Sequence, residues 1–409
     1  MVKKGFYFPG QGSQYVGMGK KMCEEFKYVS DIFDEAGEAL SENIQKLCFE
    51  GDIAKLTMTK NTQPALVTMA KAMYEVCVRE VGITPNIAAG HSIGEISALT
   101  CVGAINFSDA VKIARIRGEF MQQAVQSGDG RMCAVRGRDI KHIEEVVRNI
   151  SDNDDGTVCV SNYNSNVQTV ISGNVSAVEK AAEIFESEGC KVVHLNVSAP
   201  FHSPLMNPAA EKLRTELEKY TFNDFDVPVI SNVDALPYKG KEEIIDKLAN
   251  QLVMPVRWVE SMVYMKRYMV NYGVELGPGN TLSKMMKNNI SDIRIYSMDD
   301  ESDIKKLKRC VEKSYLPFLS RCLGIAVATK NSNFNKEEYE SGVIASYNKI
   351  SEMSKTVENE GRKAALEEME LAIKLLIKIM QTKGISNEEQ KQRLDDLFYD
   401  TNTVDLFVK

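Results

Sequence analysis

The sequence predicts an α/β protein with a small inserted subdomain and a helical extension. Three observations support this prediction. Short apolar strands alternate with amphipathic helices up to about residue 305, a βαββαβ order occupies about 129–197, and strand signals almost vanish after about 330. Alternating strands and helices imply a mainly parallel sheet covered on both faces. We expect a large subdomain at 1–128 and 198–309, a small one at 129–197 and a helical extension at 310–409.

The first part of the chain begins with a short buried strand, GFYFP at 5–9, and a flexible loop from Gly10 to Gln14. Pro64 lies in the first turn of a predicted helix, a position that tolerates proline. Ser108 is the expected N-cap of a later helix, and the glycine-rich segment 127–130 that follows it is a subdomain boundary. The helices predicted here cover about 17–50, 62–81, 95–101 and 108–126, with a strand at 87–89.

The small subdomain has its own rhythm. Strands are expected at 131–135, 158–161, 168–172 and 191–197, and helices at 139–150 and 176–188. The residues from Asn162 to Asn166 are rich in turn formers and are expected to join the two middle strands. This order is the split βαβ unit of ferredoxin-like folds.

The chain then returns to the large subdomain and continues into the extension. Predicted helices cover about 205–220, 241–252 and 256–272, with strands at 227–232 and 274–276. In the extension, Asn335 with Glu338 and Ser386 with Glu389 have the spacing of capping boxes. Apolar residues between them recur at three- and four-residue steps, with a break near Gly361. The extension could dock a partner, self-associate or pack on the rest of the chain.

Composition excludes several classes of function. A net charge of −7 and a pI near 5.5 argue against nucleic acid or an anionic membrane as the main partner. No apolar run is long enough for a signal peptide or a membrane span. The nine cysteines include no C-x-x-C pair and no zinc spacing, so we expect reduced thiols, a cytoplasmic protein and no metal.

The most informative segment is Gly90-His91-Ser92-Ile93-Gly94. It follows the apolar run 87–89 and precedes a helix-compatible run, which is the context of a nucleophile elbow. Small neighbours suit the strained turn, and the helix amino terminus offers free N–H groups to a developing oxyanion. The context therefore makes Ser92 the candidate nucleophile.

A serine nucleophile needs a base, and the chain has only four histidines. His91 should point away from Ser92, His142 lies in a charged helix, and His194 alternates with apolar residues in a strand. His202 lies in a proline-flanked loop, where catalytic groups often occur. His202 is therefore the candidate base, although a structural histidine remains open from the residues alone.

Two further residue types could serve an acyl site. Gln11 lies between two glycines, where a backbone N–H can approach a substrate oxygen, although the residues alone favour an ordinary strand-to-helix turn. Arg115 and Arg117 share a helix but face different directions, so at most one enters a given pocket. A buried arginine there would bind a planar carboxylate through two parallel hydrogen bonds.

With these residues in hand, positions 1 to about 305 resemble the malonyl-CoA:acyl carrier protein transacylases. Six segments carry the resemblance in order: GQGSQ at 10–14, GHSIGE at 90–95, RIRGEFMQ at 115–122, SNYNS at 161–165, APFH at 199–202 and NQLVMPVRW at 250–258. The family combines a hydrolase-like large subdomain with a ferredoxin-like insertion, which agrees with the rhythm above. The extension departs from the family, whose stand-alone members end near 305–310.

The resemblance implies a role for each matching residue. Ser92 would carry the acyl group, and His202 would act as base and then acid. The N–H groups of Gln11 and Ile93 would form the oxyanion hole, and Arg117 would bind the free carboxylate of malonyl. The resemblance also places four residues at the substrate pocket or in support of the histidine: Gln251, Asn162, Phe201 and His91.

The implied reaction is ping-pong transfer of malonyl from coenzyme A to Ser92 and then to the phosphopantetheine thiol of an acyl carrier protein. It needs no cofactor. Phe201 before His202 is the pattern that accompanies malonyl rather than methylmalonyl in related acyltransferases. Fatty acid and polyketide synthesis both remain open, with the extension favouring a discrete enzyme that serves a polyketide synthase.

The sequence leaves two alternatives to transfer. The first is a hydrolase that clears stalled acyl groups from carrier proteins, although such relatives tend to lack the arginine at the position of Arg117. The second is a non-catalytic scaffold that acts through its helical tail. The carrier-binding face should be basic, because carrier proteins are acidic, and five residues are candidates by charge alone: Arg257, Lys266, Arg267, Lys284 and Lys287.

Overall fold

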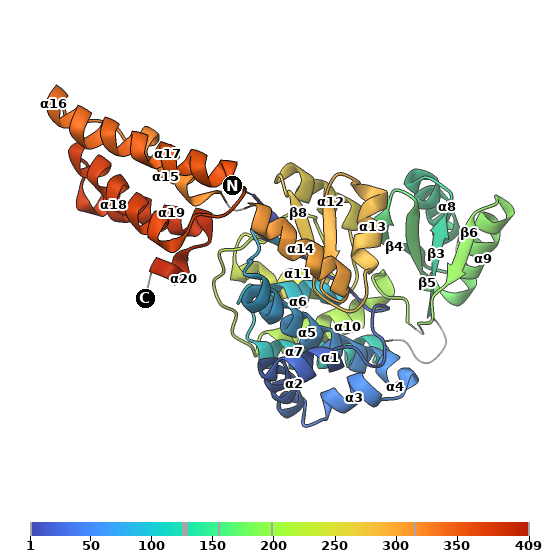
Figure 1. Ribbon diagram of the computed structural model, residues 1–409. Coiled ribbons are helices and arrows are strands. Elements are labelled where there is room, and N and C mark those ends of the chain that lie inside the picture. The colour runs from blue at the N-terminus through green and yellow to red at the C-terminus, as the bar shows by residue number, and fades with distance from the viewer. Residues whose placement is uncertain (1, 125–129, 154–155, 198, 315, 408–409) are drawn as a thin grey trace. The chain divides into compact units, whose positions relative to one another are not determined.

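A parallel five-stranded sheet forms the centre of the larger of two compact units, residues 1–308 (Figure 1). The computed structural model describes residues 2–124, 130–153, 156–197, 199–314 and 316–407. The sheet has the order β7-β2-β1-β8-β9, and every neighbouring pair is parallel. Its strands are β1 (Lys4–Phe8), β2 (Ile87–Gly90), β7 (Val229–Ile230), β8 (Tyr272–Glu275) and β9 (Arg294–Ser297).

Helices connect these strands and bury them. The strands are apolar and almost completely buried, as expected for a parallel sheet covered on both faces. The helices of this part are α1 (Lys20–Glu25), α2 (Lys27–Leu40), α3 (Ile44–Glu50), α4 (Ile53–Thr57), α5 (Thr59–Val76), α6 (Ile93–Cys101), α7 (Phe107–Gln123), α10 (Asn207–Leu217), α11 (Ile244–Asn250), α12 (Trp258–Arg267) and α13 (Thr281–Asn289). The π-helical turn η1 (Cys77–Val81) extends α5, and the 3₁₀ turns η2 (Pro204–Met206) and η3 (Lys241–Glu243) precede α10 and α11.

A second, antiparallel sheet forms the inserted subdomain. Its order is β4-β5-β3-β6, which is the ferredoxin-like arrangement that the βαββαβ rhythm predicts. The elements are β3 (Gly130–Arg136), α8 (Ile140–Asp152), β4 (Val158–Ser165), β5 (Gln168–Asn174), α9 (Val175–Ser187) and β6 (Lys191–His194). The predicted fold class, an α/β protein with both sheets and C-terminal helices, is confirmed.

Several local predictions were wrong. Residues 162–165 continue β4 instead of forming a turn, because Asn162 and Tyr163 pair with β5 and also with Val256 of the large subdomain. Helix α7 begins at Phe107 after Asn106, and the Ser108 hydroxyl donates to Glu35 instead of capping the helix. The predicted boundary segment 127–130 lies outside the described residues except for Gly130.

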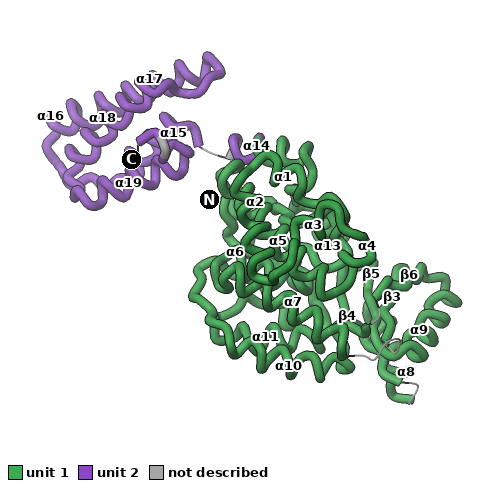
Figure 2. Tube along the Cα trace, turned by 90° about the horizontal axis from the view of Figure 1, so that it is seen from below, with its two compact units in different colours: residues 1–308 green, residues 309–409 purple. Residues whose placement is uncertain are grey.

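The second compact unit, residues 309–409, is helical in its described part (Figure 2). Helix α14 (Glu301–Ser314) runs into it from the larger unit, and it contains α15 (Phe318–Ala328), α16 (Lys336–Tyr339), the π-helical turn η4 (Glu340–Ile344), α17 (Ala345–Asn359), α18 (Leu366–Thr382), α19 (Asn387–Thr401) and α20 (Val404–Phe407). Asn335 and Ser386 cap α16 and α19 as predicted. The helical stripe is interrupted around Gly361, between the end of α17 and the start of α18.

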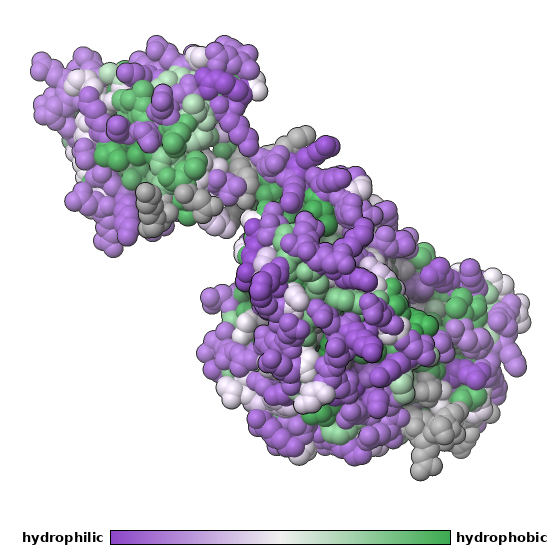
Figure 3. All heavy atoms as spheres, turned by 60° about the horizontal axis from the view of Figure 1, so that its bottom comes forward, coloured by the Kyte–Doolittle hydropathy of each residue, from purple (hydrophilic) through white to green (hydrophobic). Residues whose placement is uncertain are grey.

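The helical unit has its own buried cluster, whose members all come from residues 318–407, and Figure 3 shows that apolar side chains also gather on one part of its surface. Among the helices described, none combines the length and the apolar character that a membrane span requires.

Gly118 allows helices α5 and α7 to approach closely. A Cβ atom at Gly118 would lie 2.6 Å from Cα of Lys60 and 2.8 Å from the carbonyl oxygen of Thr59. Gly118→Ala should therefore lower the free energy of unfolding by about 1–3 kcal/mol, because backbone atoms must move. The measurement is urea unfolding followed by the fluorescence of Trp258, the single tryptophan, which is buried in the larger unit.

Gly324→Ala is the matched control, since a Cβ atom there meets only a terminal nitrogen of Arg321, at 4.0 Å. Because alanine has the higher helix propensity, Gly324→Ala should leave the free energy of unfolding unchanged or raise it by up to about 1 kcal/mol. Circular dichroism is the measurement for this variant. Equal stability of Gly118→Ala and the parent protein would contradict the close approach.

Candidate active site

The turn between β2 and α6 presents Ser92 at the start of a helix. Ser92 has φ 53° and ψ −114°, a strained conformation for a residue with a side chain. The glycines on either side are required by contact: a Cβ at Gly90 would lie 1.9 Å from the carbonyl of Gly94, and one at Gly94 would lie 2.1 Å from the carbonyl oxygen of Phe8. This is the geometry of a nucleophile elbow.

His202 lies beside this serine as the sequence predicts. The distance between Ser92 Oγ and His202 Nε2 is 2.8 Å, and that between His202 Nδ1 and the main-chain oxygen of Gln251 is 2.7 Å. A carbonyl oxygen only accepts, so Nδ1 carries the proton and Nε2 is free to accept the serine proton. Burial, and secondly the charge of Arg117, lower the pKa of His202 to about 3, so the ring is a neutral base.

Two backbone N–H groups near Ser92 are available to a ligand. The N–H of Ile93 begins α6, and the N–H of Gln11 follows β1; neither donates to any residue in the described part of the chain. Both residues line the same cavity as Ser92 and His202. The N–H of Ser92 itself is occupied, since it donates to Oδ1 of Asn232 at 2.7 Å. The arrangement can therefore hold an oxyanion between Ile93 and Gln11.

Arg117 is a buried cation with unused hydrogen-bond donors. Only 1% of its surface is exposed, and its Nη2 donates to Gln251 Oε1 at 2.8 Å and to Ser92 Oγ at 3.3 Å. Its Nε and Nη1 have no partner within the part of the chain that the structure describes. Burial lowers the pKa of Arg117 to about 10, which leaves it charged at neutral pH. Arg115 points elsewhere and donates to Asn61 and Glu42. A buried cation with two free donors fits a planar carboxylate.

Below the elbow lies a polar network that the sequence interpretation missed. Glu95 is fully buried, and its carboxylate accepts from Gln251 Nε2 at 2.6 Å, from the Asn232 N–H at 2.9 Å and from the Tyr238 hydroxyl. Burial raises the pKa of Glu95, and these three donors oppose that rise. The sequence pattern that could have identified Glu95 is an acidic residue within the apolar run of α6. No sequence pattern identifies Asn232 or Tyr238 as members of the network.

The remaining predicted pocket residues surround the serine. A cavity of about 270 Å³ contains Ser92, and His91, Asn162 and Phe201 line it. His91 is held by Asn164 Oδ1, 2.8 Å from its Nε2, and its ring lies edge-on to Trp258. Apolar side chains supply much of the remaining lining, namely Met121, Met132, Ala134, Val170, Leu195 and Val197. Arg117 reaches this cavity through its contact with Ser92 Oγ, and Gln251 contacts Arg117.

The other two histidines lie outside this site. His142 is bound to Glu188 on the small subdomain, and His194 lies near Glu179 on β6. Within the described residues, no group of three or more His, Cys, Asp or Glu side chains is placed to hold a metal ion. The hydrogen bond between Ser92 Oγ and His202 Nε2 suits nucleophilic catalysis by Ser92 with His202 as base.

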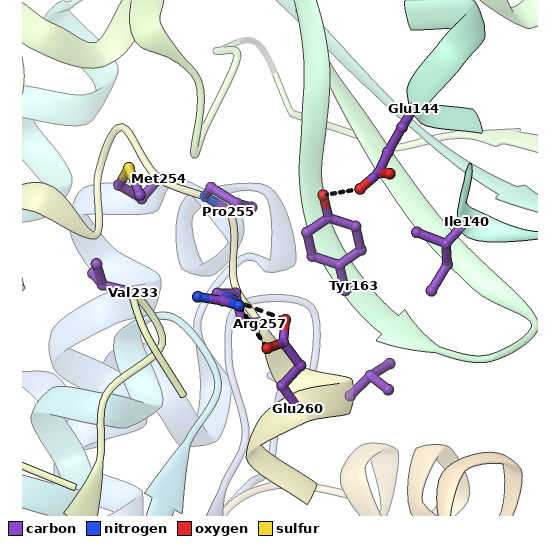
Figure 4. Close-up of a pocket in the computed structure, with 9 residues that line it drawn as sticks. Ile140, Glu144, Tyr163, Val233, Met254, Pro255, Arg257 and Glu260 are labelled. Atoms are coloured by element: carbon purple, nitrogen blue, oxygen red, sulfur yellow. Dashed lines mark hydrogen bonds and ion pairs between the residues drawn. The ribbon is translucent and has the colours of Figure 1, made fainter. Parts of the chain in front are cut away.

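A second cavity, of about 390 Å³, lies between the subdomains (Figure 4). Tyr163 points into it from β4, whereas its neighbours Asn162 and Asn164 line the cavity that contains Ser92. Its polar groups are already paired: Tyr163 donates to Glu144 at 2.7 Å, and Arg257 donates through two nitrogens to Glu260. These four polar side chains are paired with one another, and among the described residues neither a serine nor a histidine lines this cavity. The cavity that contains Ser92 is therefore the candidate active site.

Comparison with known proteins agrees with this geometry. The family model for the acyl transferase domain matches residues 5–319. A malonyl CoA-acyl carrier protein transacylase of Bacillus subtilis is 37% identical over 391 residues, covering 94% of this chain and 98% of that protein. Another of that name, from Bacillus subtilis strain 168, is 44% identical over 306 residues, covering 75% of this chain and 96% of that protein.

Solved structures show the same relationship. The crystal structure of a malonyl CoA-acyl carrier protein transacylase from Clostridium perfringens matches with a TM-score of 0.72 at 38% identity, covering 76% of this chain and 98% of that one. A malonyl-transacylase in complex with its type II polyketide synthase acyl-carrier protein matches with a TM-score of 0.73 at 34% identity, covering 76% of this chain and 100% of that one. Sequence identity and structural similarity over this length establish the family: the chain belongs to the malonyl CoA-acyl carrier protein transacylase family of acyl transferases.

Proposed function

We propose that this protein transfers a malonyl group from malonyl-CoA, through an ester on Ser92, to the phosphopantetheine thiol of an acyl carrier protein. The observation that carries the proposal is Arg117, a buried cation with two unpartnered donors next to the Ser92–His202 pair. A neutral acyl group would leave that cation uncompensated, whereas the free carboxylate of malonyl would pair with it.

The first half-reaction forms the acyl-enzyme. Ser92 Oγ attacks the thioester carbonyl while its proton passes to His202 Nε2, which lies 2.8 Å away. The N–H groups of Ile93 and Gln11 bind the oxyanion, and loss of one such donor typically costs about 100- to 1,000-fold in rate. The C–S bond then breaks, and the departing coenzyme A sulfur takes the proton from His202.

The second half-reaction reverses these steps with a different thiol. The carrier thiol gives its proton to His202 and attacks the ester, and Ser92 Oγ leaves with that proton. One thioester replaces another, so the site must lower a barrier and keep water out. The apolar residues of the cavity favour the thiol over water as the acceptor. Release of free malonate would instead mark the hydrolase alternative.

The cavity supports malonyl in preference to branched acyl groups. Phe201 is mostly buried and lines the cavity next to His202, where a branching methyl would need space. One methyl is worth about 1–3 kcal/mol in an apolar pocket, so this is a preference rather than an absolute barrier.

The carrier protein would approach at α13. Lys284 and Lys287 are exposed on this helix and have no ion pair with a described residue, while Thr281, Leu282 and Met285 of the same helix line the cavity. Among the other basic candidates, Arg257 and Lys266 form ion pairs with Glu260 and Asp292, so their charges are less available to an acidic carrier protein. A basic face beside the cavity suits an acidic carrier.

The product, a malonyl carrier protein, serves fatty acid or polyketide synthesis. The transfer proposed here uses residues of the chain, a thioester donor and a thiol acceptor, and calls for no cofactor. The nine cysteines are all free thiols, in keeping with a cytoplasmic reaction.

Malonyl-CoA should add one malonyl group to the parent protein and none to Ser92→Ala, because the hydroxyl is the acceptor. Intact-mass spectrometry, followed by transfer to a holo carrier protein, measures both halves of the reaction. Ser97→Ala is the matched control, since Ser97 is buried on the same helix and its hydroxyl has no partner. Labelling of Ser92→Ala equal to the parent would refute the assigned nucleophile.

Arg117→Ala should reduce kcat/KM for malonyl-CoA by about 100- to 1,000-fold, because the carboxylate loses its charged partner. Acetyl-CoA, which has no carboxylate, should gain relative to malonyl-CoA. Arg115→Ala is the matched control on the same helix, and the ratio of malonyl to acetyl loading should not move. Equal losses for the two acyl groups in Arg117→Ala would assign Arg117 a structural role.

The acid limb of the pH profile should lie far below the ordinary histidine range. With the pKa of His202 lowered to about 3, the ring stays a neutral base as the pH falls, so loading of Ser92 at pH 5.5 should nearly equal that at pH 7.5. An ordinary histidine with a pKa near 6.5 would retain only about one tenth of the rate at pH 5.5. Stopped-flow loading rates at constant ionic strength test this.

The charge of Arg117 contributes to that lowering, so Arg117→Ala should move the acid limb upward when acetyl-CoA is the donor. Because the unfolded chain takes up a proton on His202 below about pH 6.5 and the folded chain does not, stability should also fall as the pH drops through that range. An acid limb centred at 6.5 in the parent would contradict the neutral, buried base.

A further inference from the structure

A buried glutamine lines the catalytic cavity with its amide unsatisfied. Gln63 lies near the start of α5 and is 1% exposed. Among the described residues, its Nε2 donates only to the sulfur of Met121, at 3.4 Å, and its Oε1 has no partner. A thioether is a weak acceptor, so neither end of this amide makes a strong hydrogen bond. Buried polar groups normally have partners, and one that faces a ligand cavity points to a missing ligand group.

The position of Gln63 relates it to Arg117. Met121 follows Arg117 by four residues on α7, so the two side chains leave the same face of that helix. Helices α5 and α7 pack closely around Gly118, and the Lys60 N–H donates to Gln122 Oε1 at 2.9 Å, which fixes their register. Gln63 therefore lies one helical turn of α7 away from Arg117, on the side that faces the cavity.

A malonyl carboxylate has more acceptor sites than Arg117 can fill. An ionised carboxylate offers about four lone-pair sites. Arg117 has only Nε and Nη1 unpartnered, because its Nη2 is bound to Gln251 and Ser92. A carboxylate in this apolar cavity would need a further donor, and the amide of Gln63 can turn over at little cost because Met121 binds it weakly.

We propose that Gln63 is a second binding residue for the carboxylate of the malonyl group, beside Arg117, and so a determinant of the choice of acyl group. This inference rests on the proposed function, because it names a contact within the same site. Arg117 supplies the charge, and Gln63 supplies a neutral donor that selects the orientation of the carboxylate. A neutral acyl group such as acetyl would leave the amide as it is in the ligand-free protein.

The test is the ratio of malonyl to acetyl loading in Gln63→Leu, which keeps the shape of the side chain without its amide. Loading of Ser92 from malonyl-CoA should fall about 10- to 100-fold in kcat/KM, the size expected for a hydrogen bond to a charged group. Loading from acetyl-CoA should change by less than about threefold. Gln63→Glu should lose more malonyl loading than Gln63→Leu, because a carboxylate at that position would repel the substrate.

Thr68→Val is the matched control on α5. Thr68 is buried, and its hydroxyl donates to the main-chain oxygen of Pro64, away from the cavity lining. It should leave the malonyl-to-acetyl ratio unchanged. In the double variant with Arg117→Ala, Gln63→Leu should cause a smaller further loss than it causes alone, because the carboxylate is no longer held in place.

Equal losses of malonyl and acetyl loading in Gln63→Leu would overturn the proposal and assign Gln63 a structural role. An unchanged ratio in Gln63→Leu, with a parent protein that loads malonyl, would overturn this inference alone. A parent protein that takes no malonyl from malonyl-CoA would overturn the proposed function and this inference together.

Discussion

The buried carboxylate of Glu95 is the interaction on which the rest of the site depends. No cationic side chain of the described residues forms an ion pair with it, and three hydrogen bonds stabilise its charge in place of water. Each bond fixes a different part of the site. The Asn232 N–H positions the side chain that holds the Ser92 N–H, and Gln251 Nε2 positions the amide that holds Arg117. The Tyr238 hydroxyl donates the third hydrogen bond to the Glu95 carboxylate.

Gln251 passes this order on to the catalytic base. Its side chain is fixed by Glu95, and its main-chain oxygen accepts from His202 Nδ1 at 2.7 Å. An acidic residue bound directly to the histidine would favour the protonated ring, whereas a carbonyl oxygen fixes the tautomer without adding a charge. The negative charge of Glu95 instead acts on Arg117 and supports the protonated guanidinium. The site thus keeps a neutral base and a charged arginine close together.

The turn at Ser92 and most of the fold could be predicted from the sequence, because local sequence patterns determine them. The strand, glycine and serine pattern around Ser92 predicted the elbow, and the alternation of strands and helices predicted both sheets. Long-range pairing defeated the prediction for residues 162–165, since contact with β5 and Val256 overrides their turn propensity. Helix α13 was missed because its sequence, TLSKMMKNN, is mostly polar. The role of the main chain at Gln251 leaves no trace in residue identity.

The separate buried cluster of the helical unit has a consequence for the ancestry of the protein. Its apolar members among the described residues all come from residues 318–407. A relative from Bacillus subtilis strain 168 is matched over 96% of its own length by 75% of this chain, whereas another Bacillus subtilis relative is matched over 94% of this chain. A module with a self-contained core can be gained or lost by gene fusion without repacking the enzyme. The surface residues of such a module can then change without a matching change in the core of the enzyme.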